Sequence, residues 1–343
     1  MKAPRSVLRQ LPNLEVLLER LEEAPEPVPG PLMELAEAPE RAGPPAFTRE
    51  RLLEAGTRAI RRIHDEGEDV DLDPAEMFGL EAIVHVEGRP ALLIQNGRFA
   101  APPTQWQILE QSRDRIERTC RSVGRIEVDG HPSFEWIGTG FLVAEDVVMT
   151  NRHVASEFSQ RGQGGRWGFI AGIRARIDYV EELGAANPAE FAITDVIGIH
   201  RKFDLALLRV ERQSSQGLPS PEPLTVASQA PSNVQGRQVY AVGYPAWDGR
   251  RNDPLVMQRI FLEIFNVKRL QPGEIMQFLG QKRLFLHDCS TLGGNSGSCV
   301  VDLQTHQVIG LHFGGRYLQG NSAVALWLLT RDRLLKKAQV NFG

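Results

Sequence analysis

From Cys120 onward, short apolar runs alternate with Gly, Pro, Asn and Asp, a texture typical of strands joined by turns. Runs at this spacing with little intervening helix predict an all-β barrel or sandwich. The strands are predicted at 122–128, 134–144, 146–150, 166–178, 191–199, 204–210, 237–244, 259–270, 282–288, 298–303, 307–313 and 323–329, followed by a helix at 330–338. The chain from residue 119 to 343 is therefore one predicted β domain.

The first third of the chain has a different pattern. Leucines at helical spacing predict a helix over 6–23, and a Glu/Pro-rich stretch at 24–46 indicates an extended linker. A second amphipathic helix is predicted from Thr48 to about His64, a β-hairpin at 83–86 and 91–94, and a third helix at 103–118. Residues 1–118 are thus predicted to form a small α/β region that precedes the β domain.

Charge divides the chain in the same place. Residues 1–118 contain 15 Lys and Arg against 22 Asp and Glu, whereas the remainder contains 24 against 21. An acidic first part argues against a nucleic-acid partner there. The charge asymmetry leaves room for the two parts to dock on each other, although a solvated acidic face is the commoner explanation.

Composition narrows the class of protein and its expected location in the cell. Hydrophobic residues make up 42% and charged residues 24% of the 343, as in ordinary globular proteins. Charges interrupt the first twenty residues and no apolar run is long enough to span a bilayer, so we expect a cytoplasmic protein without membrane contact. Cys120, Cys289 and Cys299 lack metal-ligand spacing and are expected as reduced thiols, and no metal or cofactor is implied.

A serine in a glycine-rich stretch is the first candidate for chemistry. Ser296 lies in Thr-Leu-Gly-Gly-Asn-Ser-Gly-Ser, residues 291–298, immediately before a strand. Such a loop can aim backbone N–H groups at one point while it presents a hydroxyl. His153 ends the strand Val-Val-Met-Thr-Asn-Arg-His-Val, and Asp204 begins Asp-Leu-Ala-Leu-Leu. Together they supply a nucleophile, a base and an orienting acid.

These three segments resemble the motifs of chymotrypsin-fold (trypsin-like) serine proteases over roughly residues 119–340. The resemblance implies two six-stranded antiparallel β-barrels with the site between them. It also implies that Ser296 is the nucleophile, that His153 is the general base, and that Asp204 orients the imidazole. The backbone N–H groups of Gly294 and Ser296 would form the oxyanion hole. Asp195 is a rival acid, but it lacks the apolar run that follows Asp204.

An α/β-hydrolase is the alternative fold for a serine hydrolase. Its nucleophile elbow reads Gly-x-Ser-x-Gly, whereas position 298 here is Ser. Its histidine follows the nucleophile after an acid, but His306 and His312 come too soon after Ser296. That fold is disfavoured.

Within the family, the closest resemblance is to the bacterial-type glutamyl endopeptidase branch, carried by residues 290–298 and 308–315. There, Thr291 and His312 would contact an acidic side chain before the scissile bond, since a hydroxyl and an imidazole can both donate to a carboxylate. The base of the pocket is Ser290 rather than aspartate, which disfavours a Lys/Arg preference. Phe313, Gly314 and Gly315 would pair with the substrate backbone. The alternative is that His312 is structural and the pocket accepts small or apolar side chains.

Asn295 departs from the digestive branch, where an aspartate receives the ammonium of a newly cut N-terminus; a neutral amide forms no such ion pair. The predicted function is that of a serine endopeptidase acting on proteins or peptides through an acyl-enzyme. Residues 1–118 are predicted to regulate or target it, or to bind a regulatory protein. The alternative is a catalytically latent protease-fold scaffold that acts as a protein-binding module.

Overall fold

A computed structural model describes residues 49–67, 70–73, 76, 89–162, 164–246, 261, 264–316 and 320–343. The chain divides into two compact units, Met1–Gly88 and Arg89–Gly343. None of the described helices combines the length and the apolar character that a membrane span requires.

The first unit contains helix α3 (Arg49–Glu66), which confirms the helix predicted at 48–64. Its buried residues Ala55, Ala59 and Ile63 recur at helical spacing and form its apolar face. Arg62 bridges Glu66 and Glu76 at 2.9 Å each. The predicted helix at 6–23, the linker at 24–46 and the first hairpin strand at 83–86 lie outside the described residues.

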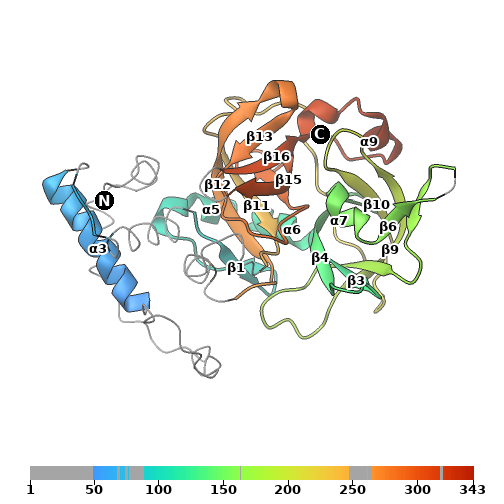
Figure 1. Ribbon diagram of the computed structural model, residues 1–343, viewed down its shortest axis with the longest axis horizontal. Coiled ribbons are helices and arrows are strands. Elements are labelled where there is room, and N and C mark those ends of the chain that lie inside the picture. Colours follow the sequence, from blue (N-terminus) through green and yellow to red (C-terminus); the bar gives the residue numbers. More distant parts are fainter. Residues whose placement is uncertain are drawn as a thin grey trace. The chain divides into compact units, whose positions relative to one another are not determined.

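The second unit contains two closed antiparallel barrels, which confirms the predicted fold class. The first barrel, green to yellow-green in Figure 1, has the strand order β10-β5-β4-β3-β8-β9. Its strands are β3 (Val123–Asp129), β4 (Trp136–Ala144), β5 (Val147–Thr150), β8 (Arg174–Asp178), β9 (Glu190–Ile199) and β10 (Ala206–Val210). A short hairpin, β6 (Ser159–Arg161) with β7 (Trp167–Phe169), and helix α7 (Arg152–Ser156) lie between β5 and β8 in the chain.

The second barrel, mostly orange and red in Figure 1, has the order β11-β14-β15-β16-β13-β12 and is closed by pairing between β11 and β12. Its strands are β11 (Gln238–Gly243), β12 (Arg269–Leu279), β13 (Leu284–His287), β14 (Cys299–Asp302), β15 (Val308–Arg316) and β16 (Gly320–Ala325). The 3-10 turns η3 (Gly280–Lys282) and η4 (Leu326–Leu329) and helix α9 (Arg333–Lys337) complete it.

Alternate side chains of some strands pack into two different hydrophobic cores. On β4, Leu142 packs inside the first barrel, whereas Phe141 and Val143 enter a second core that contains residues of both barrels. On β11, Ala241 packs inside the second barrel and Tyr240 enters the same shared core. Because both faces of these strands are buried, the strands are apolar throughout rather than alternating. The shared core holds the barrels together.

Residues 89–121 belong to the second unit rather than to the N-terminal part. They form β1 (Leu92–Gln95), β2 (Arg98–Phe99), η2 (Thr104–Trp106), α5 (Ile108–Gln111) and α6 (Arg113–Arg121). β1 pairs with β12, and Trp106 and Ile116 are buried in the shared core. The compact unit therefore begins earlier than the boundary predicted between residues 118 and 119.

Several predicted elements differ from the structure. The strand at 91–94 exists as β1, but its hairpin partner is β2, joined through Asn96 and Gly97. The helix predicted at 103–118 is split into η2, α5 and α6. The strand predicted at 166–178 is interrupted before β8, where Gly172 has φ +85°. The strand predicted at 323–329 ends at Ala325 and continues as η4.

The largest difference is β12, predicted at 259–270 and observed at Arg269–Leu279. Its Gln-Pro-Gly-Glu sequence is typical of a turn. Tertiary pairing overrides that signal, since Pro272 lies opposite Tyr240 of β11. The final helix, predicted at 330–338, is observed as α9, where the Asp332 carboxylate caps the N-terminus by accepting from the N–H groups of Leu334 and Leu335.

Candidate active site

His153 is placed by a short helix at the end of β5. Asn151 precedes α7 with extended backbone, and its side chain donates to the carbonyl of Asp204 at 2.8 Å. Arg152 donates to the carbonyls of His200 and Phe203, so it braces the segment that carries Asp204. These contacts tie two segments that are far apart in the sequence.

His153 and Asp204 form a hydrogen-bonded pair. The imidazole Nδ1 lies 2.7 Å from Asp204 Oδ2, and the backbone N–H of His153 donates to Asp204 Oδ1 at 3.0 Å. Burial acts to raise the pKa of Asp204, but the hydrogen bonds and charge attraction from His153 outweigh it and hold that pKa below its usual value. An ionised Asp204 favours the tautomer with a proton on Nδ1, which leaves Nε2 to accept a proton.

Ser296 lies, partly exposed, in a loop shaped by two glycines. Gly294 and Gly297 have φ +82° and +92°, where glycine is favoured. A Cβ added at Gly297 would lie 1.9 Å from the carbonyl oxygen of Thr139, so a side chain cannot be accommodated there. The strand β14 begins three residues after Ser296 and anchors the loop to the second barrel.

Thr139 of β4 joins this loop to the first barrel. Its N–H donates to the carbonyl of Ser296 at 2.8 Å, and its hydroxyl donates to the carbonyl of Gly294 at 2.8 Å. The Thr139 carbonyl accepts from the hydroxyl of Thr150, the last residue of β5. One strand residue therefore connects the serine loop to the segment that leads into His153.

The two backbone N–H groups predicted to form the oxyanion hole are free of hydrogen bonds to other described residues. Within the described residues, the N–H groups of Gly294 and Ser296 donate to no acceptor. Between them, Asn295 is buried and held locally, since its N–H donates to the Leu292 carbonyl and its amide lies 3.4 Å from the Ser298 hydroxyl. Two backbone N–H groups that lack an acceptor and lie beside a serine can stabilise an oxyanion.

His312 lies against the serine loop on β15. Its carbonyl accepts from Gly297 N–H at 3.0 Å, and its own N–H donates to the Ser298 carbonyl at 2.9 Å. The ring is buried, with Nδ1 3.2 Å from Nε2 of His287 on β13. Burial, followed by charge repulsion from His287 and His153, lowers the pKa of His312 well below its usual value. His312 is therefore neutral at pH 7.

His287 is the residue that the sequence analysis missed. It is fully buried, and burial lowers its pKa to about 3. The only local signal is an isolated polar residue in Leu-Phe-Leu-His, and nothing in the sequence indicates that β13 brings it to His312.

The other predicted pocket residues have different surroundings. The hydroxyl of Ser290 donates to the Arg89 carbonyl at 2.6 Å, while the Arg89 guanidinium pairs with Asp288 at 2.7 Å. Thr291 is partly exposed in the loop before Ser296. The hydroxyl of Ser290, the predicted base of the pocket, is thus already engaged with the first residue of the second unit.

Residues Phe313, Gly314 and Gly315 extend β15 beyond its pairing with β14, which ends at Leu311 in the described register. Their other edge faces β16, where Gly314 pairs with Ser322. Among the described residues no strand pairs with the edge toward the serine loop beyond Leu311, which leaves that edge to a further strand.

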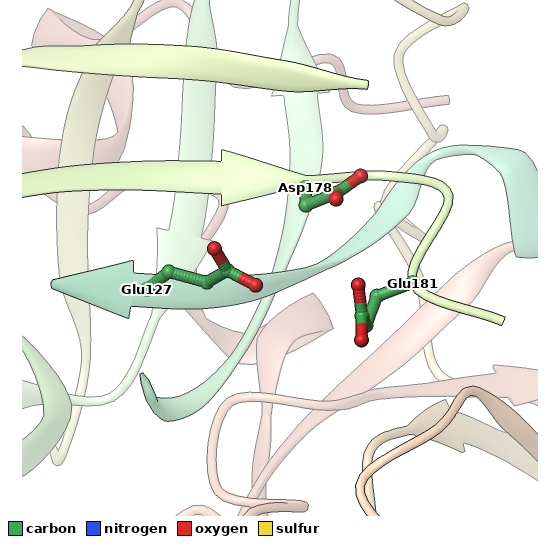
Figure 2. Close-up of side chains that lie close together, drawn as sticks. All are labelled: Glu127, Asp178 and Glu181. Atoms are coloured by element: carbon green, nitrogen blue, oxygen red, sulfur yellow. The ribbon is translucent and has the colours of Figure 1, made fainter. Parts of the chain in front are cut away.

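Three carboxylates could be considered as metal ligands. Glu127 on β3, Asp178 at the end of β8 and Glu181 have oxygen atoms within 4.8 Å of one another (Figure 2). Arg125 contacts Glu127 at 2.6 Å and Glu181 at 3.0 Å, and Arg176 contacts Glu127 at 2.7 Å. Guanidinium groups thus already balance this cluster.

Comparison with known proteins agrees with the fold. A family model described as a trypsin-like peptidase domain matches residues 138–311. A probable serine protease of Lysobacter enzymogenes is 30% identical over 312 residues, covering 81% of this chain and 79% of that protein. The chain belongs to the trypsin-like peptidase family. It is a serine endopeptidase, and its substrates are proteins or peptides.

Other relatives in the trypsin-like family carry a more specific name. A glutamyl endopeptidase of Staphylococcus epidermidis is 28% identical over 189 residues, so this chain spans 57% of its length. A glutamyl endopeptidase of Staphylococcus aureus is 25% identical over 263 residues, 73% of this chain and 65% of that protein.

Two solved structures are also similar. A serine endoprotease from Yersinia pestis has a TM-score of 0.44 and 15% identity, covering 70% of this chain and 69% of its own. The active form of a protease from M. tuberculosis has a TM-score of 0.43 and 20% identity, covering 70% of this chain and 89% of its own.

Proposed function

We propose that Ser296, His153 and Asp204 form the catalytic triad of this endopeptidase. Ser296 Oγ attacks the scissile carbonyl carbon while His153 Nε2 takes its proton. The N–H groups of Gly294 and Ser296 stabilise the oxyanion, and His153 then delivers the proton to the leaving amine. Water hydrolyses the acyl-enzyme by the reverse proton route. The 2.7 Å contact between His153 and Asp204 is the observation that carries this assignment.

A fluorophosphonate probe tests the triad against a latent scaffold. The wild-type protein should be labelled, whereas Ser296→Ala should not. Ser298→Ala is the matched control, because Ser298 lies in the same loop but is buried. Absence of labelling in folded wild-type protein would favour the binding-module alternative.

We further propose a preference for Glu or Asp before the scissile bond. A proton on His287 Nε2 can be donated to His312 Nδ1, which leaves Nε2–H of His312 to donate to a substrate carboxylate. Thr291 supplies a hydroxyl from the serine loop. The similarity to staphylococcal glutamyl endopeptidases supports the same preference.

A peptide-library cleavage profile tests this preference. Peptides with Glu should exceed matched Gln peptides in kcat/KM by more than tenfold, and His312→Leu should remove most of the difference. His131→Gln, on the first barrel, serves as the control. A profile dominated by small or apolar side chains would support the structural role of His312 instead.

We also propose that the N-terminal part regulates or targets the protease. The acidic balance of residues 1–118 supports it, and since residues 89–118 pack within the protease unit, the regulatory part is narrowed to 1–88. Deletion of residues 1–46 should change peptidase activity or the set of bound proteins. An unchanged rate together with unchanged partners would contradict this role.

We place the protein in the cytoplasm. All three cysteines are free and buried, and burial raises the pKa of the Cys120 thiol to about 12, so it is unreactive. Fractionation of expressing cells should recover the protein in the soluble cell extract; recovery from the medium or periplasm would contradict it.

A further inference from the structure

A hollow of about 1020 Å³ lies outside the candidate active site. Its walls come from helix α6, from the loop that follows β8, and from the connection between the barrels at 218–225. The turns between β1 and β2 and between β14 and β15 also contribute lining residues. None of the proposed catalytic or pocket residues lines it. It is a separate groove, which we call the α6 groove.

One wall of the α6 groove carries a row of arginines. Arg115, Arg118 and Arg121 recur every third residue on α6 and are exposed. None of the ion pairs between described residues involves them. Arg113 on the same helix contrasts, because it pairs with Glu110 at 2.5 Å and Glu117 at 2.7 Å. The arginines of the groove are thus available to a ligand.

Two residues beside the groove each carry a buried polar atom that lacks a partner within the described residues. The Tyr179 hydroxyl belongs to a side chain only 3% exposed and makes no hydrogen bond. The Nδ1 atom of His306 is likewise buried without a partner. A buried polar group without a partner is costly unless a ligand or water satisfies it. Both residues line the groove.

The charge of the groove is positive on balance. Glu182 lines it but is engaged, since it accepts from Gly97 N–H at 2.8 Å and lies 3.6 Å from Lys268 Nζ. Glu222 is the exposed carboxylate among the lining residues. Burial first, then the charges of Arg115 and Arg118, lowers the pKa of His306, consistent with this field.

The opposite wall is apolar and extended. The connection reads Leu-Pro-Ser-Pro-Glu-Pro-Leu, and its leucines and prolines line the groove. Leu218 is 46% exposed, so its side chain is accessible to an apolar group of a ligand. A ligand that fits both walls has negative charges on one side and apolar side chains on the other.

We propose that the α6 groove is an exosite that binds an acidic, apolar-containing segment of a protein substrate. The helix rise places successive arginines about 4.5 Å apart, or about 9 Å from first to last. A proline-containing peptide in the polyproline II conformation has three residues per turn, so its glutamates three residues apart lie on one face about 9.3 Å from each other, and two carboxylates can meet the two ends of the row. Arginine forks bind carboxylates with two parallel hydrogen bonds. The inference rests on the endopeptidase function and not on the acidic pocket preference.

A binding assay with the full chain tests the site. The probe is a fluorescein-labelled dodecapeptide of four Glu-Leu-Pro repeats, and the protein carries Ser296→Ala to prevent cleavage. Combined Arg115→Gln, Arg118→Gln and Arg121→Gln should weaken binding at least tenfold. Arg331→Gln, Arg333→Gln and Lys336→Gln remove the same charge beside α9 and should change it less than twofold.

A kinetic arm tests the exosite role. Two peptides share one cleavage sequence, and one carries the Glu-Leu-Pro segment while the other has Gln in place of Glu. The acidic peptide should have a KM at least fivefold lower with equal kcat, and the α6 triple variant should abolish the difference. If the protein proves to be catalytically latent, neither peptide will be cleaved, but the binding assay will still test the exosite.

Several outcomes would overturn the exosite. These are equal losses of binding in the two triple variants, equal binding of the Gln peptide, or tighter binding of a single-stranded oligonucleotide of matched charge. Equal KM values for the two substrate peptides would exclude a role in substrate binding.

Discussion

At the scale of single residues, the candidate site depends on the protonation states of one aspartate and three histidines. Asp204 is kept ionised by its contact with His153, while His312 and His287 are kept neutral by burial. The three histidines thus face different environments, although the sequence presents them alike.

Asp204→Asn should reduce kcat by about 10⁴-fold, the loss typical when a triad imidazole adopts the wrong tautomer. The amide preserves size and the hydrogen bond from the His153 N–H, so folding should be retained. Steady-state kinetics on a peptide substrate, with thermal unfolding as a control for folding, measure this. A loss under tenfold would argue against Asp204, and Asp195→Asn would then be compared.

His287 should make the protein sensitive to acid. Its folded-state pKa of about 3 lies below the value of about 6.5 in an unfolded chain, so the unfolded state binds the proton first as pH falls. The stability that the neutral His287 side chain contributes to the folded state is therefore lost as the pH falls below about 6.5. Between pH 7 and pH 5 this costs about 2 kcal/mol of unfolding free energy.

Urea unfolding of wild type and His287→Leu tests that cost. The variant should lose about 2 kcal/mol less than wild type between pH 7 and pH 5. Between pH 7 and pH 9 the difference between the two proteins should stay constant. An identical loss in both proteins on acidification would show that His287 is not a buried neutral group.

At the scale of elements, β4 does more than complete a barrel. Its residue Thr139 holds the serine loop through Ser296 and Gly294 and contacts the end of β5 through Thr150. This bridging role could not be read from the sequence, because it depends on the second barrel meeting β4.

Thr139→Val should keep the shape of the side chain but remove its hydroxyl. The Gly294 carbonyl then loses its donor and the Tyr244 N–H its acceptor. We expect a loss of about 1–3 kcal/mol in unfolding free energy, with kcat falling because the oxyanion loop is less well held. Thr119→Val is a buried comparison away from the loop. An unchanged kcat would separate Thr139 from the geometry of the site.

At the scale of the whole molecule, the barrels and the segment before them act as one unit. Lys268 is fully buried just before β12, and its ammonium donates to the carbonyls of Cys120 at 2.9 Å and Tyr179 at 2.6 Å. It therefore joins the second barrel to α6 and to the first barrel. Burial lowers its pKa, opposed by the charge of Glu182.

Lys268→Met should destabilise the protein by on the order of 3–5 kcal/mol, because Glu182 and two carbonyls lose a buried partner. The control is Lys282→Met, at an exposed position, which should change stability by less than about 0.5 kcal/mol. Urea unfolding measures both. A neutral Lys268→Met would mean that this buried ammonium does not help to hold the barrels together.

The β class could be read from the sequence for local reasons, and so could the residues that we propose as the triad. Turn residues between short apolar runs predict strands, and His153, Asp204 and Ser296 each lie in a motif a few residues long. The β12 strand was misplaced because Pro272 and Gly273 imitate a turn, and residues 89–118 were assigned to the wrong side of the boundary.

Only the tertiary structure decided which distant residues meet. The contact of His287 with His312, the bond from Ser290 to Arg89, and the meeting of α6 with the 218–225 connection all join segments far apart in the chain. Such contacts follow from strand order, register and barrel closure. Local periodicity specifies the faces of a strand but not the strand beside it.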